Sequence, residues 1–240
     1  MSDYEWERRP REPEGRTRVG VSVSLPALDP SLWSRFKEYL LGRDLSPEVA
    51  IHNGWYPSSV AGDREPRVVI IGARTTGTFW QARAMLAPDT VYPTAQRAVT
   101  RYPPILRYQS PPGPRGDALI IVDPLPALVS ATPVRPGVVL VEGPMCALAA
   151  AGVGYRGVAI MGNFNGEPPA PPTLEHLIKA IRGHPVVIVG DLDSPAALAP
   201  TAAALAAKGG VRCRMVVCPR KDLADLPAPL RGTLLVGWFA

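Results

Sequence analysis

The sequence is poor in the residues that build disulfide frameworks and zinc sites. Its 240 residues include only three cysteines and three histidines. None of these residues stands at the Cys-x-x-Cys or His-x-x-x-His spacing of a zinc-binding pair. Neither a disulfide-stabilised secreted domain nor a zinc finger is supported, and we expect the protein to work in a reducing compartment.

Long apolar runs are also missing from the sequence. No stretch approaches the about 18 consecutive apolar residues that a membrane-spanning helix needs. Residues 1–16 alternate charges where a signal peptide would carry an apolar run. We therefore expect a soluble, cytoplasmic protein with no membrane partner.

The composition is that of a globular protein with many short elements. Hydrophobic residues make up 46% and charged residues 20% of the chain, which is enough apolar material for a core. Proline and glycine together supply about a fifth of the residues, so long helical bundles are disfavoured. The length is compatible with one large domain or two small ones.

Positive charge is concentrated in the first half of the chain. The formal net charge is +5, and 22 of the 26 basic residues are arginines, whose planar guanidinium suits phosphate groups. Eight basic residues but only two acidic ones lie between Arg64 and Arg115. This segment predicts a phosphate-binding surface.

The first half is predicted to be a mixed α+β subdomain that follows a flexible arm. Residues 1–25 are charged and lack apolar periodicity, as in a flexible arm. The subdomain, residues 26–135, carries helix-starting and strand-like segments. We expect helices at 30–42 and 46–54, a strand pair within 67–83 with its turn at 75–77, and a strand at 118–122.

The second half, residues 136–240, alternates apolar strands with helices. Such alternation is typical of a mostly parallel, Rossmann-like sheet covered on both faces, so the fold class is α/β. We expect strands at 138–142, 158–162, 186–191, 213–218 and 233–239, and helices near 145–151, 173–182 and 195–208.

Acidic residues follow three of these predicted strands. In a parallel sheet ligands collect at the carboxyl ends of the strands. Carboxylates gathered there would suit Mg²⁺ or Mn²⁺ rather than zinc. If the backbone stays extended after 190, the two carboxylates of Asp191-Leu192-Asp193 face the same way. The alternative is that these acids cap helices or are solvated loop charges. The residues concerned are Glu142, Asp191, Asp193, Asp222 and Asp225.

At these motifs the sequence resembles the Toprim domain of DnaG-type primases, topoisomerases and some nucleases. The similar segments, within about 136–226, are VVLVEGPMCALAAAGVGYRGVAIMG, VVIVGDLDS and CPRKDLADL. They carry the Glu-Gly and the later Asp-x-Asp that mark the family. Lys221-Asp222 with Asp225 downstream is most similar to the primase branch.

The first half also resembles the catalytic core of DnaG-type primases, more loosely. The similar segments are YLLGRDLSPEVAIHNGWYP, RVVIIGARTTGTFWQAR and Arg107-Tyr108-Gln109-Ser110-Pro111. The sequence departs from the family at Cys146, where many primases carry Asp, and at Pro195, where Ala-Gly is common. It also lacks the family's zinc-binding module, so template selection is expected to be weak or to depend on a helicase or zinc-binding partner protein.

The resemblance implies a DNA primase that joins nucleoside triphosphates into primers on a single-stranded DNA template. Asp191 and Asp193 would hold Mg²⁺ or Mn²⁺, with Asp222 and Asp225 contributing, and Glu142 would be a metal ligand or a general base. Lys221 would contact the triphosphate, although a structural pairing with a neighbouring acid stays open for it. Arg83, Arg107 and Tyr108 would contact the template or the incoming nucleotide, although solvated or ion-paired surface roles stay open for them.

Two other classes of function remain open. A Toprim nuclease would use the same carboxylates to direct water at a phosphodiester. A non-catalytic accessory protein would bind single-stranded DNA through the arginine-rich segment alone. The carboxylates disfavour the accessory protein, because a binding module has no need of negative charge beside its nucleic acid.

Overall fold

The structure, a computed structural model, describes residues 24–59, 65–74, 77–86, 108–111, 118–161 and 167–240. The predicted flexible arm lies outside these residues except for its last two positions. Arg107 and most of the arginine-rich segment also lie outside them.

The helices and strands predicted for the first half are present. Asp29 and Ser46 cap the two helical segments, accepting hydrogen bonds from the backbone N–H groups of Ser31 and Val49. A proline follows each cap in the first turn, where its missing N–H costs nothing. The elements are η1 (Pro30–Leu32), α1 (Trp33–Leu41), α2 (Pro47–His52), β1 (Tyr56–Ser58), β2 (Arg67–Arg74), β3 (Gly77–Ala84), β4 (Tyr108–Gln109) and β5 (Ala118–Val122).

The second half alternates strands and helices up to its fourth strand, as predicted. The helix expected from residue 195 begins four residues later, because turns occupy residues 192–198. The elements are β6 (Val138–Val141), α3 (Pro144–Ala151), β7 (Arg156–Met161), α4 (Pro171–Ile181), β8 (Val186–Gly190), α5 (Ala199–Gly209), β9 (Cys213–Val217), η2 (Leu223–Asp225) and α6 (Ala228–Phe239).

One mixed sheet runs through both halves of the described chain. Its strand order is β4-β3-β2-β5-β7-β6-β8-β9, with β1 pairing β2. The pairs β6–β7, β6–β8 and β8–β9 are parallel, and β5 joins them to β2 through antiparallel pairs on both of its sides. The sheet is therefore continuous across residue 135, where the two predicted subdomains meet.

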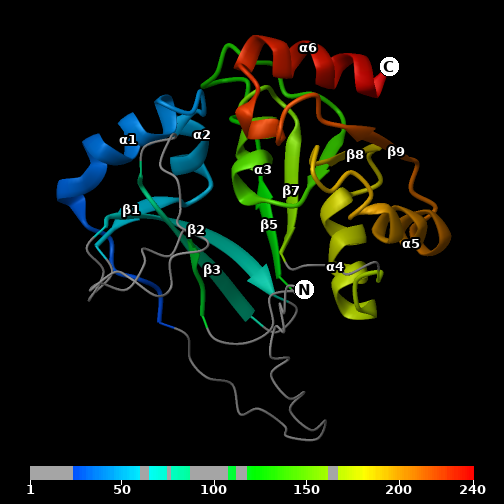
Figure 1. Ribbon diagram of the computed structural model, residues 1–240, viewed down its shortest axis with the longest axis horizontal. Coiled ribbons are helices and arrows are strands. Elements are labelled where there is room, and N and C mark those ends of the chain that lie inside the picture. The colour runs from blue at the N-terminus through cyan, green and yellow to red at the C-terminus, as the bar shows by residue number, and fades with distance from the viewer. Residues whose placement is uncertain (1–23, 60–64, 75–76, 87–107, 112–117, 162–166) are drawn as a thin grey trace, which may run out of the picture.

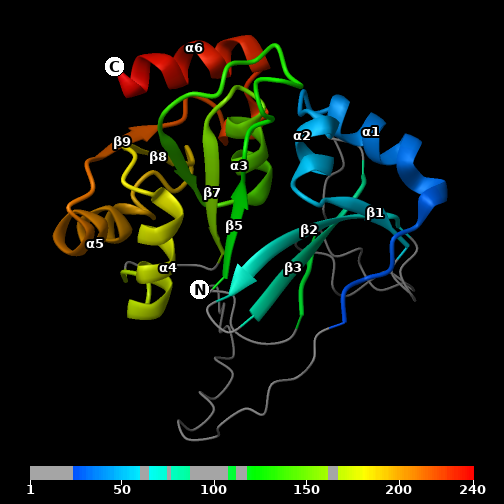
Figure 2. The same cartoon turned by 180° about the vertical axis from the view of Figure 1, so that it is seen from behind.

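Helices cover both faces of the parallel part, as the continuous apolar strands predict. Val139 and Val141 of β6 pack into a cluster with α3, whereas Val138 and Leu140 pack into a second cluster with α4 and α5. Alternation along the strand directs successive side chains to opposite faces, so an all-apolar strand needs a helix layer on each side. Figures 1 and 2 show α4 and α5 beside this part of the sheet and α1 and α2 beside β1.

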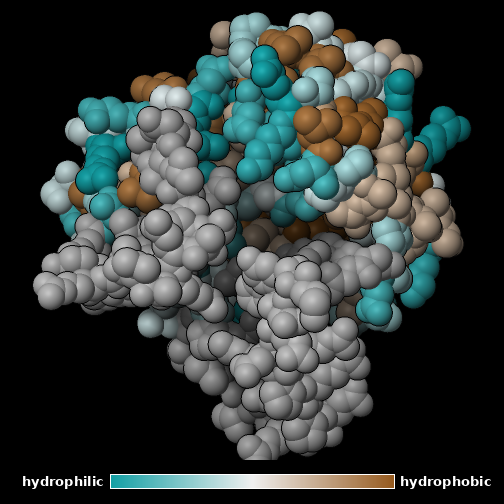
Figure 3. Space-filling model, viewed as in Figure 1, coloured by the Kyte–Doolittle hydropathy of each residue, from teal (hydrophilic) through white to brown (hydrophobic). Residues whose placement is uncertain are grey.

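The strand predicted at 233–239 is wrong, because these residues belong to helix α6. A short apolar run is compatible with a strand or with a buried helix. Here Pro227 and Pro229 start a helix, and Phe239 at its end stacks on Tyr155 with ring centroids 4.5 Å apart. β9 thus stays at the sheet edge, with Met215 and Val217 exposed. Hydrophobic residues also lie at the surface over α6 (Figure 3).

None of the helices in the described residues is both long and apolar enough to cross a membrane.

Candidate active site

The carboxyl ends of the neighbouring strands β6 and β8 bring Glu142 and Asp191 to one rim of the sheet. Glu142 directly follows β6 and Asp191 directly follows β8. The strands pair in register, with Leu140 opposite Ile188. Ser194 joins the two ends, because its hydroxyl donates a hydrogen bond to Glu142 Oε1 at 3.1 Å. This serine was not singled out from the sequence; its place directly after the Asp-x-Asp was the available signal.

The backbone after β8 turns instead of staying extended. Ser194 N–H donates to the Asp191 carbonyl at 3.1 Å. Gly190 allows this turn, since a Cβ at that position would collide with the backbone of Pro195. Strand alternation therefore does not orient Asp191 and Asp193, and the extended arrangement considered from the sequence is not formed. Asp193 is exposed in the turn, beside the half-buried Asp191.

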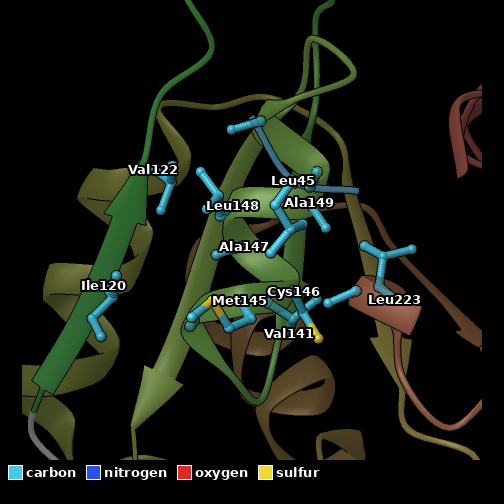
Figure 4. Packing of buried hydrophobic residues seen from close by; sticks show 14 of the residues in the cluster. Leu45, Ile120, Val122, Val141, Met145, Cys146, Ala147, Leu148, Ala149 and Leu223 are labelled. Carbon is cyan, nitrogen blue, oxygen red and sulfur yellow. The ribbon is translucent and has the colours of Figure 1, made fainter. Parts of the chain in front are cut away.

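Asp222 and Asp225 lie on the η2 loop, which packs against α3. Asp222 caps η2 and accepts a hydrogen bond from Asp225 N–H at 3.1 Å. The Asp225 carboxylate lies 3.7 Å from the Arg43 guanidinium. Cys146 of α3 accepts hydrogen bonds from the backbone at Leu223 and Ala224. In Figure 4, Cys146 and Leu223 face each other between α3 and η2.

The pKa values show that these carboxylates influence one another. Burial, and then the charges of the other four carboxylates, raise the pKa of Asp191 from 3.8 to about 7. Burial also raises the pKa of Glu142, with the Ser194 hydrogen bond opposing and Asp193 adding to the shift. Burial, Asp222 and Asp191 raise the pKa of the Cys146 thiol well above its usual value, so the thiol stays protonated.

The chemistry of this donor set fits a hard divalent cation. Its oxygens are carboxylates on three strand ends, and their mutual repulsion would be relieved by a positive charge among them. The side chains do not form a ready-made ligand cage, however. Within the described part of the chain, no three His, Cys, Asp or Glu side chains are grouped closely enough to hold a metal ion.

A buried arginine of α6 supports the η2 loop. Arg231 is 1% exposed, and its guanidinium donates to the carbonyls of Leu223 at 3.2 Å, Leu226 at 2.6 Å and Asp44 at 3.2 Å. Burial lowers its pKa, and the charge of Asp44 opposes the shift. Arg231 thus connects the loop between α1 and α2 to the loop that carries Asp222 and Asp225. The sequence gives no sign of this role, because a lone arginine in an apolar run has no local partner.

Of the predicted nucleic-acid contacts, Arg83 and Tyr108 lie together on β3 and β4. Arg83 is only 4% exposed and donates hydrogen bonds to the hydroxyls of Tyr39, at 2.6 Å, and of Tyr108. Burial acts to lower the pKa of Arg83, but the two tyrosine oxygens outweigh it and the pKa is raised. Lys221 is exposed beside the carboxylates, and its carbonyl accepts a hydrogen bond from Leu192 N–H at 3.0 Å.

Comparison with known proteins shows that the fold of this chain is similar to that of a primase fragment. No protein-family model and no curated protein sequence matches the chain. The primase fragment of the bacteriophage T7 primase-helicase protein is similar in structure, with a TM-score of 0.53 and 16% identity over 84% of this chain and 73% of that chain. The chain therefore has a primase-like α/β fold.

Two further solved structures share less of the arrangement. A DNA primase domain from Pseudomonas aeruginosa matches with a TM-score of 0.47 and 16% identity over 84% of this chain and 68% of that one. T7 primase domains, in a complex with an RNA/DNA hybrid, dTTP and the lagging-strand DNA polymerase, match with a TM-score of 0.44 and 15% identity over 84% and 90%.

Proposed function

We propose that this protein is a DNA primase whose catalytic centre is a Toprim-type cluster of carboxylates. The observation that carries the proposal is that Glu142 and Asp191 follow neighbouring parallel strands at one rim of a primase-like sheet, with three further carboxylates near enough to act on Asp191. Burial, and then the charges of the other carboxylates, raise the pKa of the half-buried Asp191 to about 7, a strong perturbation for an Asp. Perturbed carboxylates at the carboxyl edge of a parallel sheet are typical of catalytic sites.

Asp191 and Asp193 are the proposed ligands of Mg²⁺ or Mn²⁺, with Glu142, Asp222 and Asp225 completing the set. A divalent cation bound there would supply electrostatic stabilisation to a nucleophilic hydroxyl and to the phosphate that it attacks. The chain's own contribution is to hold the carboxylates in place. Ser194 orients Glu142, whereas Arg231 and Cys146 hold the η2 loop.

The bound reactants are proposed to be a single-stranded DNA template and nucleoside triphosphates. Lys221, exposed beside the carboxylates, is the proposed contact to the triphosphate. Tyr108 is proposed to contact the template, and the buried Arg83, whose guanidinium lies 5.0 Å from the centroid of the Tyr108 ring, is proposed to act on the template through Tyr108. A helicase or zinc-binding protein is the proposed partner for template selection. The proposed location is the cytoplasm.

The test is incorporation of labelled nucleotides on single-stranded DNA in the presence of Mg²⁺ or Mn²⁺. The purified protein is compared with Asp191→Asn/Asp193→Asn, which keeps the shape of the side chains but removes two negative charges. Glu38→Gln, an exposed acid on α1, is the matched control for charge removal. We expect template-dependent products from the wild type and from the control, and a loss of at least about 100-fold in the double variant.

Two results would contradict the primase proposal. If the wild type cleaves the DNA and never extends it, and the double variant abolishes this cleavage, the site is that of a nuclease. If the double variant changes neither synthesis nor cleavage while DNA binding persists, the carboxylates are not catalytic and the protein is an accessory DNA-binding protein.

A further inference from the structure

A second polar site lies between the end of β2 and the outward face of α4. It is a hollow of about 310 Å³ lined by Arg74, Pro172, Glu175, His176 and Lys179. The four α4 residues recur at helical spacing on one side of the helix. The opposite side, with Leu174 and Leu177, is buried against the sheet. The hollow is therefore bounded by a helix that is itself firmly packed.

The lining of the hollow is mostly basic and polar. Among the described residues of the lining, Arg74 and Lys179 carry positive charges and Glu175 carries one carboxylate. Arg74 is half-buried, and its guanidinium lies 5.1 Å from the centroid of the Phe79 ring, which restricts its position. The Nδ1 atom of His176 is buried and has no hydrogen-bond partner among the described residues. A guanidinium fork, an ammonium group and an imidazole together suit a phosphate group.

The strand register places this hollow at the same rim of the sheet as the carboxylates. Arg74 pairs with Ala118, and Ala118 pairs with Met161, two residues beyond the pairing partner of Val141. β2 is separated from β6 by three strand spacings, which is about 14 Å. That separation corresponds to about four nucleotides at the rise of a stacked strand.

We propose that the hollow between Arg74 and α4 binds a phosphate group, carried by a nucleic-acid strand that also reaches the carboxylates or by a free nucleotide. The position along the rim favours the strand. This inference rests on the proposed function, which supplies both kinds of phosphate-bearing ligand. It adds a contact on α4 that no sequence motif indicated.

The test compares charge reversals at two exposed lysines, Lys179→Glu in the hollow and Lys208→Glu on α5 as the matched control. Binding of a short fluorescein-labelled single-stranded oligonucleotide is measured by anisotropy at several salt concentrations, in the full chain. Binding of a fluorescent nucleoside triphosphate is measured in parallel. Arg74→Gln is the second variant, and circular dichroism checks that each variant is folded.

We expect Lys179→Glu and Arg74→Gln to weaken oligonucleotide binding roughly threefold to tenfold relative to the control. The slope of log affinity against log salt should fall by about 0.7, the contribution of one phosphate contact. A loss for the triphosphate alone would also support the proposal and would identify the ligand as the free nucleotide. If Lys179→Glu and the control bind both ligands equally, the proposal is overturned.

Failure of this inference is distinguishable from failure of the proposed function. Repeating the binding measurement in the Asp191→Asn/Asp193→Asn background isolates the hollow from the carboxylates. If the protein incorporates no nucleotide but Lys179→Glu still weakens oligonucleotide binding, the inference of a phosphate site stands and only the primase proposal fails.

Discussion

At the scale of single residues, the carboxylates of the proposed centre oppose the stability of the fold. Asp191 is half-buried among four other acids, and a bound cation would relieve their repulsion. A site that binds a divalent ion must hold charges together that would otherwise separate. The folded protein without metal is therefore destabilised by charge repulsion, which a neutral side chain at position 191 would reduce.

The first prediction concerns the pH dependence of stability through Asp191. Its pKa is raised from 3.8 to about 7 in the folded protein, so the folded state binds the proton more tightly than the unfolded state. This group therefore adds stability at low pH, and that stability is lost as the pH rises through about 7. We expect Asp191→Asn to be more stable than the wild type at pH 8 by about 1–2 kcal/mol, after allowance for solvent screening.

Urea unfolding in metal-free buffer between pH 5 and pH 8 measures this difference. The advantage of Asp191→Asn should shrink toward pH 5, where the wild-type carboxyl is also neutral. Glu38→Gln, on an exposed face of α1, should show no such trend. An equal stability of Asp191→Asn and wild type across the whole range would contradict the raised pKa.

The second prediction concerns Gly190. A Cβ at this position would collide with the Pro195 backbone, which must move away. We expect Gly190→Ala to lose about 1–3 kcal/mol of stability and to displace the turn that carries Asp193. Gly183→Ala is a useful comparison, because that glycine has a φ of +74° but open space around its Cβ. Chemical denaturation of both variants separates the two effects, because Gly190→Ala tests crowding and Gly183→Ala tests backbone strain. If Gly190→Ala is as stable as the wild type, the crowding at Gly190 is refuted.

At the scale of elements, α6 and η2 are coupled through Arg231. Three backbone carbonyls share one buried guanidinium, and one of them belongs to Asp44 in the loop between α1 and α2. The Asp44 carboxylate in turn accepts a hydrogen bond from Ala228 N–H at the start of α6. The last helix therefore holds the acidic loop and the first helices in one arrangement.

The third prediction is that Arg231→Met is strongly destabilising. The methionine fills much of the volume but leaves buried carbonyls without donors, so we expect a loss of about 3 kcal/mol or more. Arg231→Lys, which retains the charge but not the three-way geometry, should fall between methionine and wild type. In both variants, hydrogen exchange relative to the wild type should speed up more for the amides of η2 than for those of α4.

Removing a surface arginine tests whether the effect is specific to the buried one. Arg214 also donates to a carbonyl, that of Trp238 at 2.9 Å, but it is exposed. Arg214→Met should change the free energy of unfolding by less than about 1 kcal/mol. Equal losses for the two variants would contradict the role assigned to Arg231.

At the scale of the whole molecule, one sheet connects the arginine-bearing strands to the acidic rim. β5 pairs with β2 on one side and β7 on the other, so the two halves cannot separate without breaking backbone hydrogen bonds. The three loops that carry the carboxylates follow strands of this one sheet, so their arrangement depends on the same folded state. A ligand that binds them should therefore stabilise the fold as a whole.

The fourth prediction is that Mg²⁺ or Mn²⁺ raises the melting temperature of the protein. The stabilisation should grow with the logarithm of the ion concentration, reaching about 2.7 kcal/mol at 100 times the dissociation constant. A chelator should reverse it, and Asp191→Asn/Asp193→Asn should not show it. Differential scanning calorimetry measures the shift, and NaCl at equal ionic strength controls for screening. An identical shift in wild type and double variant would argue against a metal site at the rim.

The sequence by itself determined the order of elements and the places where acids follow strands. The apolar segments between the helices of the second half predict strands of a parallel sheet, and each of them except the last, at 233–239, forms a strand. The prediction of residues 233–239 failed because a seven-residue apolar run has no decisive period. There, Pro227 and the contact between Phe239 and Tyr155 selected the helix.

Tertiary structure alone decided how the acids and their supports are arranged. Gly190 and Pro195 come together only after the chain folds, so the turn at Asp193 could not be inferred from strand alternation. Arg231 acquires its partners from a loop nearly two hundred residues away and from η2. Arg74 and Lys179 line one hollow, which exists only because the fold brings the end of β2 to α4. Local sequence specifies local backbone preference, whereas burial, charge repulsion and long-range hydrogen bonds exist only in the assembled fold.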